Sequence, residues 1–277
     1  MADPAPVAVD AGTIAAFERD GVVMLPGHFG PAWVDRLRAA VDRTLAMPSP
    51  HGRDFNAGDG DGRFFGDMFL WRHDADFRAL AFDSPAPGLA AALLCSRKLN
   101  LLYDQLFVKE PGAAMKTPWH HDQPYWPVQG TQVCSLWLAL DAVTAESGAV
   151  EFIAGSHRWG KWYKPTPFRA EGGAAAFVAS DDERIPDIDA ARGDYRILCW
   201  DMQPGDCLVF HALTVHGAPG NASASRRRRG HAVRYTGDDA TYAEWPGMFK
   251  FPYSPGLAPG APLDCDLYPR VWPRPQG

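Results

Sequence analysis

No apolar stretch of this 277-residue sequence is long enough to span a bilayer, so we expect no contact with a membrane. Basic residues are in the minority, with 27 Lys and Arg against 33 Asp and Glu and a net charge of −6. This balance argues against a nucleic-acid partner, which would need phosphates to be neutralised. Residues 1–6 show no basic region followed by an apolar run, so no secretory signal is predicted.

Cysteine is scarce and scattered. The five cysteines form no Cys-x-x-Cys pair, which argues against a disulfide framework and a zinc knuckle. They are Cys95, Cys134, Cys199, Cys207 and Cys265. Widely separated thiols are typical of a reducing compartment, and we therefore expect a cytoplasmic protein. The sequence does not specify an oligomeric state.

The N-terminal part carries helical patterns. Hydrophobic residues make up 46% of the chain, which is ample for a core and excludes a wholly disordered protein. Apolar spacing predicts helices at 11–19, 31–47 and 87–94, with a short strand at 22–25. Residues 48–62 are rich in Pro, Gly and Asp and predict a solvated loop.

From residue 99 onward the pattern changes to short β-rich runs separated by turn signals. These runs are 100–109, 131–140, 149–153, 196–199, 206–210 and 229–236, and 170–189 has the composition of one long insertion. Regular spacing of short strands favours a sandwich or barrel over a parallel sheet. We therefore predict an α+β, mainly β fold in a single domain over 1–277. Its helical part would cover about 1–98, its β core about 99–240, and a C-terminal extension 241–277.

The segment WHHDQPYW carries the most chemical information. His120 and Asp122 are two residues apart, so on a strand they would share one face. A second histidine, His216, follows far downstream. Two histidines and one carboxylate on one face of a metal are the ligands of non-haem Fe(II) oxygenases, which keep positions open for co-substrate and O₂. An isolated His-x-Asp pair occurs by chance in many chains, so its neighbours in the sequence decide its meaning.

A run of four arginines, 226–229, leads into an alternating strand after His216. An arginine at the start of a strand beside a metal can bind a carboxylate with two hydrogen bonds, as a 2-oxo acid requires. Four arginines cannot all point into one pocket, so we expect at least two of them to be solvated.

Taken together, these motifs resemble the phytanoyl-CoA dioxygenase family of Fe(II)/2-oxoglutarate-dependent oxygenases. The similar stretches, in family order from about Leu101 to Tyr235, are LYDQLFVKEPG, TPWHHDQPYWP, LWLALD, ESGAVEFIAGSH, GDCLVFHALTVHG and NASASRRRRGHAVRY. FERDGVVMLPG resembles the family's opening helix and strand. The resemblance implies a double-stranded β-helix (jelly-roll) core with flanking N-terminal helices, and Fe(II), 2-oxoglutarate and O₂ as cofactor and co-substrates.

Carried over by position, the resemblance makes His120, Asp122 and His216 the metal ligands and catalytic residues. His121 fills the variable middle of the motif and is expected to face away and serve a structural role. His211 is the other candidate for the distal ligand. The family pattern favours His216, which stands just before the small Gly217.

The resemblance also implies an arginine that binds 2-oxoglutarate. Family spacing counted from Asn221 points to Arg227, whereas counting back from Tyr235 points to Arg228. Strands tolerate insertions less well than loops, so Arg228 is favoured and Arg227 is second. Two further residues match family contacts to 2-oxoglutarate, namely Gln105 and Trp137, although ordinary packing also explains Trp137. Ala218 stands where relatives often have a serine, so one hydroxyl contact is missing.

The activity implied is hydroxylation of a small organic molecule with release of succinate and CO₂. Halogenating relatives have Gly or Ala at the position of Asp122, so a carboxylate there argues for hydroxylation, while desaturation and ring closure use the same ligands. Two alternatives stay open, a non-catalytic jelly-roll binding protein and a cupin-type metalloenzyme that uses no 2-oxo acid.

The substrate is not indicated by any motif. Aromatic residues near the motifs fit either a pocket wall or the core; they are Tyr125, Trp126, Trp200, Phe210 and Trp245. Lys109, Arg158 and Arg234 are candidates for pairing with an anionic substrate, or else they are solvated strand ends.

Overall fold

The computed structural model of the protein describes residues 8–55, 62–165, 184–245 and 248–273. Its helices are α1 (Ala11–Asp20), α2 (Pro31–Ala46), α3 (Ala75–Asp83) and α4 (Ala86–Leu93). Its strands are β1 (Val22–Leu25), β2 (Arg53–Asp54), β3 (Phe64–Met68), β4 (Leu99–Lys109), β5 (Thr117–His120), β6 (Val128–Gln129), β7 (Val133–Ala139), β8 (Glu151–Ile153), β9 (Ile197–Leu198), β10 (Cys207–His211), β11 (His216–Ala218), β12 (Arg228–Thr236), β13 (Thr241–Tyr242) and β14 (Arg270–Trp272).

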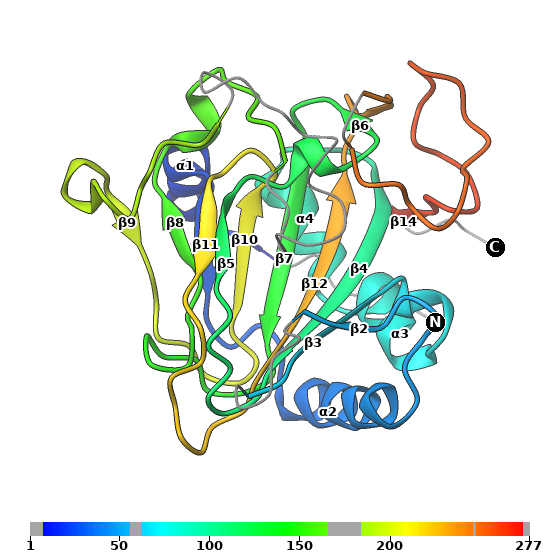
Figure 1. The fold of residues 1–277 in the computed structure, drawn as a ribbon. Coiled ribbons are helices and arrows are strands. Elements are labelled where there is room, and N and C mark those ends of the chain that lie inside the picture. Colours follow the sequence, from blue (N-terminus) through cyan, green and yellow to red (C-terminus); the bar gives the residue numbers. More distant parts are fainter. Residues whose placement is uncertain (1–7, 56–61, 166–183, 246–247, 274–277) are drawn as a thin grey trace.

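Two antiparallel sheets form the core of the fold. The larger sheet has the order β1-β10-β7-β12-β4-β3-β2, with β14 also paired to β4, and the smaller sheet has the order β5-β11-β8-β9. β13 and β6 form a separate two-stranded sheet. The smaller sheet lies against one face of the larger one (Figure 1). This arrangement is the double-stranded β-helix that the resemblance implies, so the predicted α+β, mainly β class is confirmed.

The helices cover the outer face of the larger sheet (Figure 1). One buried apolar cluster joins side chains from all four helices to side chains of β7 and β12, among them Phe17, Leu37, Phe77, Leu89, Leu136 and Val233. Burying one such side chain contributes about 1.5–3 kcal/mol. Since the helices occupy the outer face, the inner face of the sheet is left to face the smaller sheet, and the cavity described below opens between them.

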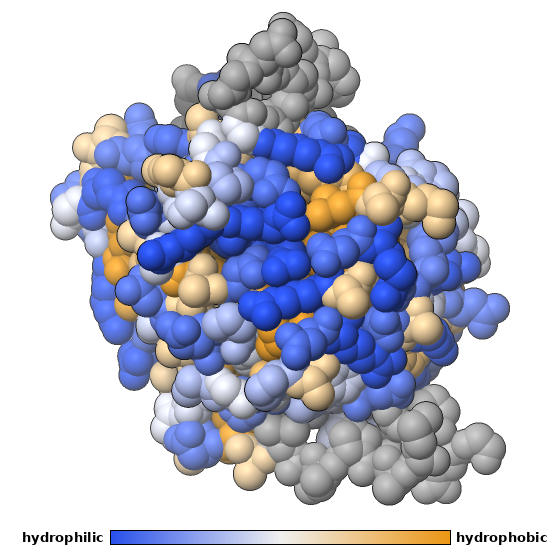
Figure 2. Space-filling model, turned by 90° about the horizontal axis from the view of Figure 1, so that it is seen from below, coloured by the Kyte–Doolittle hydropathy of each residue, from blue (hydrophilic) through white to orange (hydrophobic). Residues whose placement is uncertain are grey.

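Exposed ion pairs tie α2 to the start of α3. Arg36 pairs with Asp76, and Arg43 pairs with both Asp74 and Asp76. The face that carries α2, seen from below in Figure 2, is mostly hydrophilic, with small apolar areas between the charged side chains. Surface pairs of this kind contribute little to stability.

Most predicted elements are present within one or two residues of their expected ends. The helices predicted at 11–19 and 87–94 are α1 and α4, and the strand predicted at 22–25 is β1. Several elements were missed, among them α3, β3 and the short strands β5 and β11. β3 is buried at all five positions and has no alternation to reveal it.

The first 98 residues are not purely helical, because they supply β1, β2 and β3 to the larger sheet. The expected C-terminal extension supplies β14 to the same sheet and β13 to the two-stranded sheet with β6. Most of the insertion predicted at 170–189 lies outside the described residues. Among the residues described, no helix has the length and apolarity needed to cross a membrane.

Candidate functional site

His120 and His216 come from adjacent strands of the smaller sheet. They are direct cross-strand partners in the pairing of β5 with β11, and their ring centroids are 4.2 Å apart. Directly opposite residues on one face of an antiparallel pair are close enough for their side chains to meet. The register of β5 and β11 therefore brings two imidazoles from distant parts of the chain to one point.

Asp122 reaches the same point by a different route from the one predicted. β5 ends at His120, and Asp122 has helical backbone angles (φ −73°, ψ −42°) at the start of a short 3₁₀ helix, Gln123–Tyr125. Pro124 is the second residue of that helix and cannot continue a ladder of strand hydrogen bonds. The expectation that strand alternation places Asp122 beside His120 is wrong, although the two side chains do meet. The Asp122 backbone N–H donates to the Ala212 carbonyl at 2.8 Å, which holds the turn.

The three side chains form a compact group of possible metal ligands. Asp122 Oδ1 lies 3.4 Å from His120 Nε2 and 3.9 Å from His216 Nε2, and one ligand atom from each residue lies within 4.8 Å of the others. Donor atoms about 2.1 Å from one ion at right angles would lie about 3 Å apart. The spacing thus suits a single ion with three ligands on one face.

Hydrogen bonds fix the orientation of each ligand atom. His120 Nδ1 donates to the Pro118 carbonyl at 2.8 Å, and His216 Nδ1 donates to the Thr214 carbonyl at 2.9 Å. Each ring therefore directs Nε2, its unprotonated nitrogen, toward Asp122. Ser135 Oγ donates to Asp122 Oδ2 at 3.0 Å, which holds the carboxylate with its Oδ1 toward the histidines.

Burial and charge keep the group in its metal-binding protonation state. Burial, together with the neighbouring His120 ring, lowers the pKa of His216 to about 3. Although burial by itself raises the pKa of Asp122, its interactions with His120, His216 and Arg234 outweigh it and hold that pKa well below its usual range. At neutral pH the group offers a neutral His216 imidazole and a carboxylate, the forms that bind a divalent ion.

The other two histidine candidates serve the backbone. His121 is buried directly after the end of β5, where Tyr163 N–H donates to its Nε2 at 3.0 Å. His211 Nε2 contacts the Thr131 carbonyl, and its Nδ1 accepts from Leu213 N–H. Both rings are therefore engaged in holding loops, as the sequence predicted for His121, and His211 lies outside the group.

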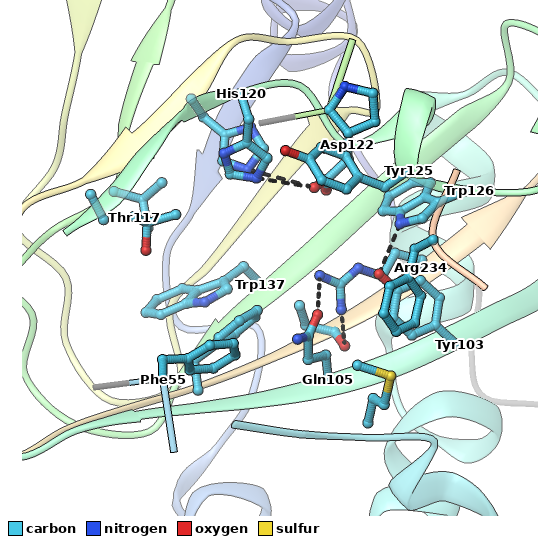
Figure 3. Close-up of a pocket in the computed structure, with 18 of the residues that line it drawn as sticks. Phe55, Tyr103, Gln105, Thr117, His120, Asp122, Tyr125, Trp126, Trp137 and Arg234 are labelled. Carbon is cyan, nitrogen blue, oxygen red and sulfur yellow. Dashed lines mark hydrogen bonds and ion pairs between the residues drawn. The ribbon is translucent and has the colours of Figure 1, made fainter. Parts of the chain in front are cut away.

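The group lies in the wall of a cavity of about 900 Å³ (Figure 3). His120, Asp122 and His216 all line it, and most of the rest of the wall is aromatic or apolar. These apolar lining residues include Phe55, Phe64, Met68, Tyr103, Phe107, Tyr125, Trp126, Trp137, Phe210, Met248 and Phe249. A largely apolar pocket with a few polar groups is the usual form of a small-molecule site.

Arg228 and Arg227 point to different environments. Arg228 is 3% exposed and lines the cavity, with its guanidinium carbon 5.6 Å from the centre of the Trp137 ring. Its buried Nε has no hydrogen-bond partner among the described residues. Arg227 is directed outward and pairs with Glu110 at 2.8 Å. Of the two arginines, only Arg228 offers its donors to the cavity.

The other predicted co-substrate contacts, Gln105 and Trp137, also line the cavity, as does Ala218. They come from β4, β7 and β11. Trp137 packs against Gly230 of β12, where a Cβ atom would lie only 1.9 Å from Trp137 Cζ2. The absence of a side chain at Gly230 is thus what allows the indole to lie across the sheet beside Arg228.

Asn221 anchors the loop that leads to Arg228. Its side-chain amide donates to the carbonyls of Lys109, Glu110 and Arg226. These bonds tie the loop to the end of β4.

Lys109 is buried in the same region, where its amino group donates to the Pro219 carbonyl at 2.7 Å and burial lowers its pKa to about 6.

Some substrate candidates reach the cavity and others do not. Tyr125, Trp126, Phe210 and Arg234 line it, whereas Trp200, Trp245, Lys109 and Arg158 are absent from its wall. Sequence reasoning missed Tyr103 and Phe107. Both alternate with Gln105 along β4, so extending the period-two pattern from Gln105 would have found them.

The model of the phytanoyl-CoA dioxygenase (PhyH) family matches residues 17–230 of this chain. Among curated proteins, the multifunctional dioxygenase prhA of Penicillium brasilianum is 25% identical over 244 residues, covering 79% of this chain and 69% of the relative. The dioxygenase lolE1 of Epichloe uncinata is also 25% identical, over 224 residues that cover 79% of this chain and 80% of the relative.

Among solved structures, this chain is similar to the non-haem α-ketoglutarate-dependent epimerase SnoN from nogalamycin biosynthesis. The TM-score is 0.71 at 26% identity, covering 94% of this chain and 97% of SnoN. A second SnoN structure, with a TM-score of 0.68, is a complex with Fe³⁺, α-ketoglutarate and nogalamycin RO. The similarity extends over nearly the whole of both chains.

Proposed function

Because the chain belongs to the phytanoyl-CoA dioxygenase family, and is therefore an Fe(II)- and 2-oxoglutarate-dependent dioxygenase, we propose that His120, Asp122 and His216 hold its iron. The observation that carries this proposal is the convergence of one oxygen and two nitrogen donors within 4.8 Å. The donor set fits the ion, because two imidazoles and a carboxylate on one face are the ligands of non-haem Fe(II) oxygenases.

Arg228 receives the distal carboxylate of 2-oxoglutarate. It is a buried cation without a carboxylate partner among the described residues, and it lies beside Trp137 in the cavity wall. An arginine fork binds a carboxylate with two charge-assisted hydrogen bonds, which compensates for the cost of burying the guanidinium. Trp137 and Gln105 line the space for the co-substrate between the arginine and the metal ligands.

With iron, 2-oxoglutarate and O₂ bound, the site supplies the oxidising power that inserts one oxygen atom into a substrate C–H bond, while 2-oxoglutarate becomes succinate and CO₂. The protein's own residues position the reactants. Ser135 and the two backbone carbonyls orient the three ligand side chains, and the aromatic wall excludes water. Since Asp122 occupies the third ligand position, halogenation is not expected, and hydroxylation of a small organic molecule is the outcome that we propose.

The two alternatives are less well supported. A non-catalytic binding protein has no need of a complete ligand set with its tautomers fixed by hydrogen bonds. A cupin-type enzyme without a 2-oxo acid leaves Arg228 as a buried cation with no acid to bind.

We also propose a cytoplasmic location, because all five cysteines are free thiols, Cys95 and Cys199 being exposed.

Anaerobic titration with Fe(II) and 2-oxoglutarate tests the proposal. We expect a weak visible charge-transfer band that requires both components, followed by succinate formation when O₂ is admitted. His216→Gln should lose the band, whereas His211→Gln should keep it. A wild-type protein that gives no band, or a band that survives in His216→Gln and is lost in His211→Gln, would show the ligand assignment to be wrong.

A further inference from the structure

A second guanidinium lies inside the cavity. Arg234 is in β12, is 4% exposed, and lines the same cavity as the metal ligands. Its Nη2 donates to Gln105 Oε1 at 3.1 Å and its Nη1 to the Ala232 carbonyl at 3.4 Å. Figure 3 shows the side chain between Gln105 and the Tyr103–Trp126 pair. Both of its acceptors are neutral, so the positive charge is not compensated by them.

Aromatic rings surround this guanidinium. Its carbon lies 4.5 Å from the centre of the Tyr103 ring, 5.7 Å from that of Trp126 and 5.9 Å from that of Phe107. Trp126 Nε1 donates to the Tyr103 hydroxyl at 2.8 Å, which locks two of the rings together. Cation–π contacts hold a guanidinium in place without using its N–H donors. Arg234 is thus fixed in position while keeping hydrogen-bonding capacity.

That capacity is unusual for a buried arginine. A guanidinium has five N–H donors, and in Arg234 two of them have acceptors among the described residues. Its Nε is buried and has no partner in the part of the chain that the structure describes. No ion pair joins Arg234 to a described carboxylate; in this part of the chain the charged contacts of Asp122 are with His120 and His216, and its other oxygen accepts from Ser135. A buried cation with unused donors is costly unless a ligand supplies the acceptors.

The charges of the cavity point to the missing partner. Its buried charged side chains are two cations, Arg228 and Arg234, and one anion, Asp122. Iron(II) and the 2-oxoglutarate dianion cancel one another when both are bound. The loaded cavity therefore keeps one excess positive charge in a wall that is otherwise mostly apolar, and a ligand with one negative charge restores the balance.

We propose that Arg234 binds the carboxylate of the primary substrate, which is a monocarboxylic acid with an aromatic or alicyclic body. The carboxylate accepts from the unused donors of Arg234, and the body packs against the rings of Trp126, Tyr125 and Phe249. This inference rests on the proposed function for the reaction, and adds the substrate class. A carboxylate suits the site better than a phosphate, because a single buried guanidinium provides one positive charge.

The test compares acids with their neutral counterparts. The probes are benzoic, cinnamic, 2-naphthoic, indole-3-acetic and cyclohexanecarboxylic acids, each paired with its methyl ester. They are titrated anaerobically into protein loaded with Fe(II) and 2-oxoglutarate, and binding is followed by the change in the charge-transfer band and by calorimetry. At least one acid is expected to bind about 10- to 100-fold more tightly than its ester. If no acid binds more tightly than its ester, the inference is wrong.

Variants then locate the carboxylate. Arg234→Gln should abolish the preference for the acid over the ester, and Arg234→Lys should keep part of it, while the surface variant Arg227→Gln should keep all of it. An acid preference that survives in Arg234→Gln would place the carboxylate elsewhere and overturn the inference. The wild-type comparison decides the matter even if Arg234→Gln fails to fold.

A further arm separates this inference from the proposed function. Metal-free Arg228→Gln protein cannot use the co-substrate arginine, so acids that bind it must use another cation. If wild-type protein fails to bind iron and 2-oxoglutarate but metal-free Arg228→Gln still prefers acids to esters, the function fails and the inference stands. If iron and 2-oxoglutarate bind but no acid binds more tightly than its ester, the proposed function stands and the inference fails.

Discussion

Arg228 and Arg234 lie six residues apart on one face of β12, and both line the same cavity. At about 3.3 Å per residue, their Cα atoms are about 20 Å apart along the strand. Regular pairing of β12 with β4 continues from Arg228 to Arg234, and the register shift comes only after Arg234. Each arginine therefore enters the cavity from its own position along the strand, and we expect each to bind an anion of its own.

Arg228→Gln should raise the Kd of 2-oxoglutarate by about 10- to 100-fold, because a charged hydrogen-bond donor to the distal carboxylate is lost. Arg227→Gln is the matched control, one residue away. Arg227 pairs with Glu110 near the surface, so its loss should leave the Kd of 2-oxoglutarate unchanged. Anaerobic titration of the Fe(II)-loaded variants measures both. Equal effects of the two substitutions, or a larger effect of Arg227→Gln, would contradict the assignment.

Asp122→Ala should weaken Fe(II) binding by at least about 100-fold, since it removes the only anionic ligand of the proposed three. Ser135→Ala should weaken it less, because it removes only the hydrogen bond that orients Asp122 Oδ2. Competition with a metal-sensitive dye under anaerobic conditions gives both affinities. Wild-type affinity in Asp122→Ala would remove this carboxylate from the metal site.

Gly230→Ala should damage both stability and co-substrate binding. The new Cβ would lie 1.9 Å from Trp137 Cζ2, so the indole must leave its place beside Arg228. Overpacking of this kind costs about 1–3 kcal/mol of the free energy of unfolding. Urea denaturation and 2-oxoglutarate titration measure the two effects. Gly193→Ala, at an exposed position with open space around it, is the control and should change neither.

Lys109 should make the metal-free protein more stable as the pH rises. Burial lowers the pKa of its amino group from the ordinary 10.5 to about 6. Between those two values the unfolded chain binds a proton that the folded chain lacks, so the free energy of unfolding increases with pH. The gain is complete above 10.5 and is lost once the pH falls below about 6.

Lys109→Met removes this group from both states, so the difference in unfolding free energy between wild type and variant should change with pH across that window. Urea denaturation at several pH values in the window measures it. Lys116→Met is the control: it replaces an exposed lysine and should follow the wild-type curve. If the Lys109→Met and wild-type curves run parallel, the amino group is charged in the folded protein.

Local patterns in the sequence predicted β4, β7, β10 and β12, which line the cavity, because each of these strands has its own turn signals and apolar run. The short strands β5 and β11, which carry the two histidines, were not among the predicted runs. The predicted run 100–109 is β4, and the predicted run 206–210 is nearly β10. α3 was missed although Phe77, Leu80 and Ala81 are spaced as one buried helical face. β3 offered less, since Gly66 and Asp67 interrupt its apolar residues. Asp67 is buried with its carboxylate accepting hydrogen bonds from Ser49, which is distant in the sequence, and from the Met68 N–H.

At the site, residue types were predictable and local geometry was not. The ligand residues follow from the resemblance, yet Asp122 arrives by a turn that Pro124 imposes. The choice between Arg227 and Arg228 depends on which of two adjacent side chains faces inward, and strand pairing settles that direction. The surroundings of Arg234 come from β4 and from the loop with Trp126, so they depend on packing between distant segments. The single-domain division and the ligand roles stay predictions.

The pairing of His120 with His216 makes the reactive centre depend on the alignment of two very short strands. β5 has four residues and β11 has three, and His121 stands directly after His120. Sliding β5 by a single step would present the wrong imidazole to the iron, with no change in composition. Insertions in the connecting loops should therefore be tolerated during evolution or engineering, whereas a one-residue deletion inside 117–120 should abolish activity in a protein that still folds.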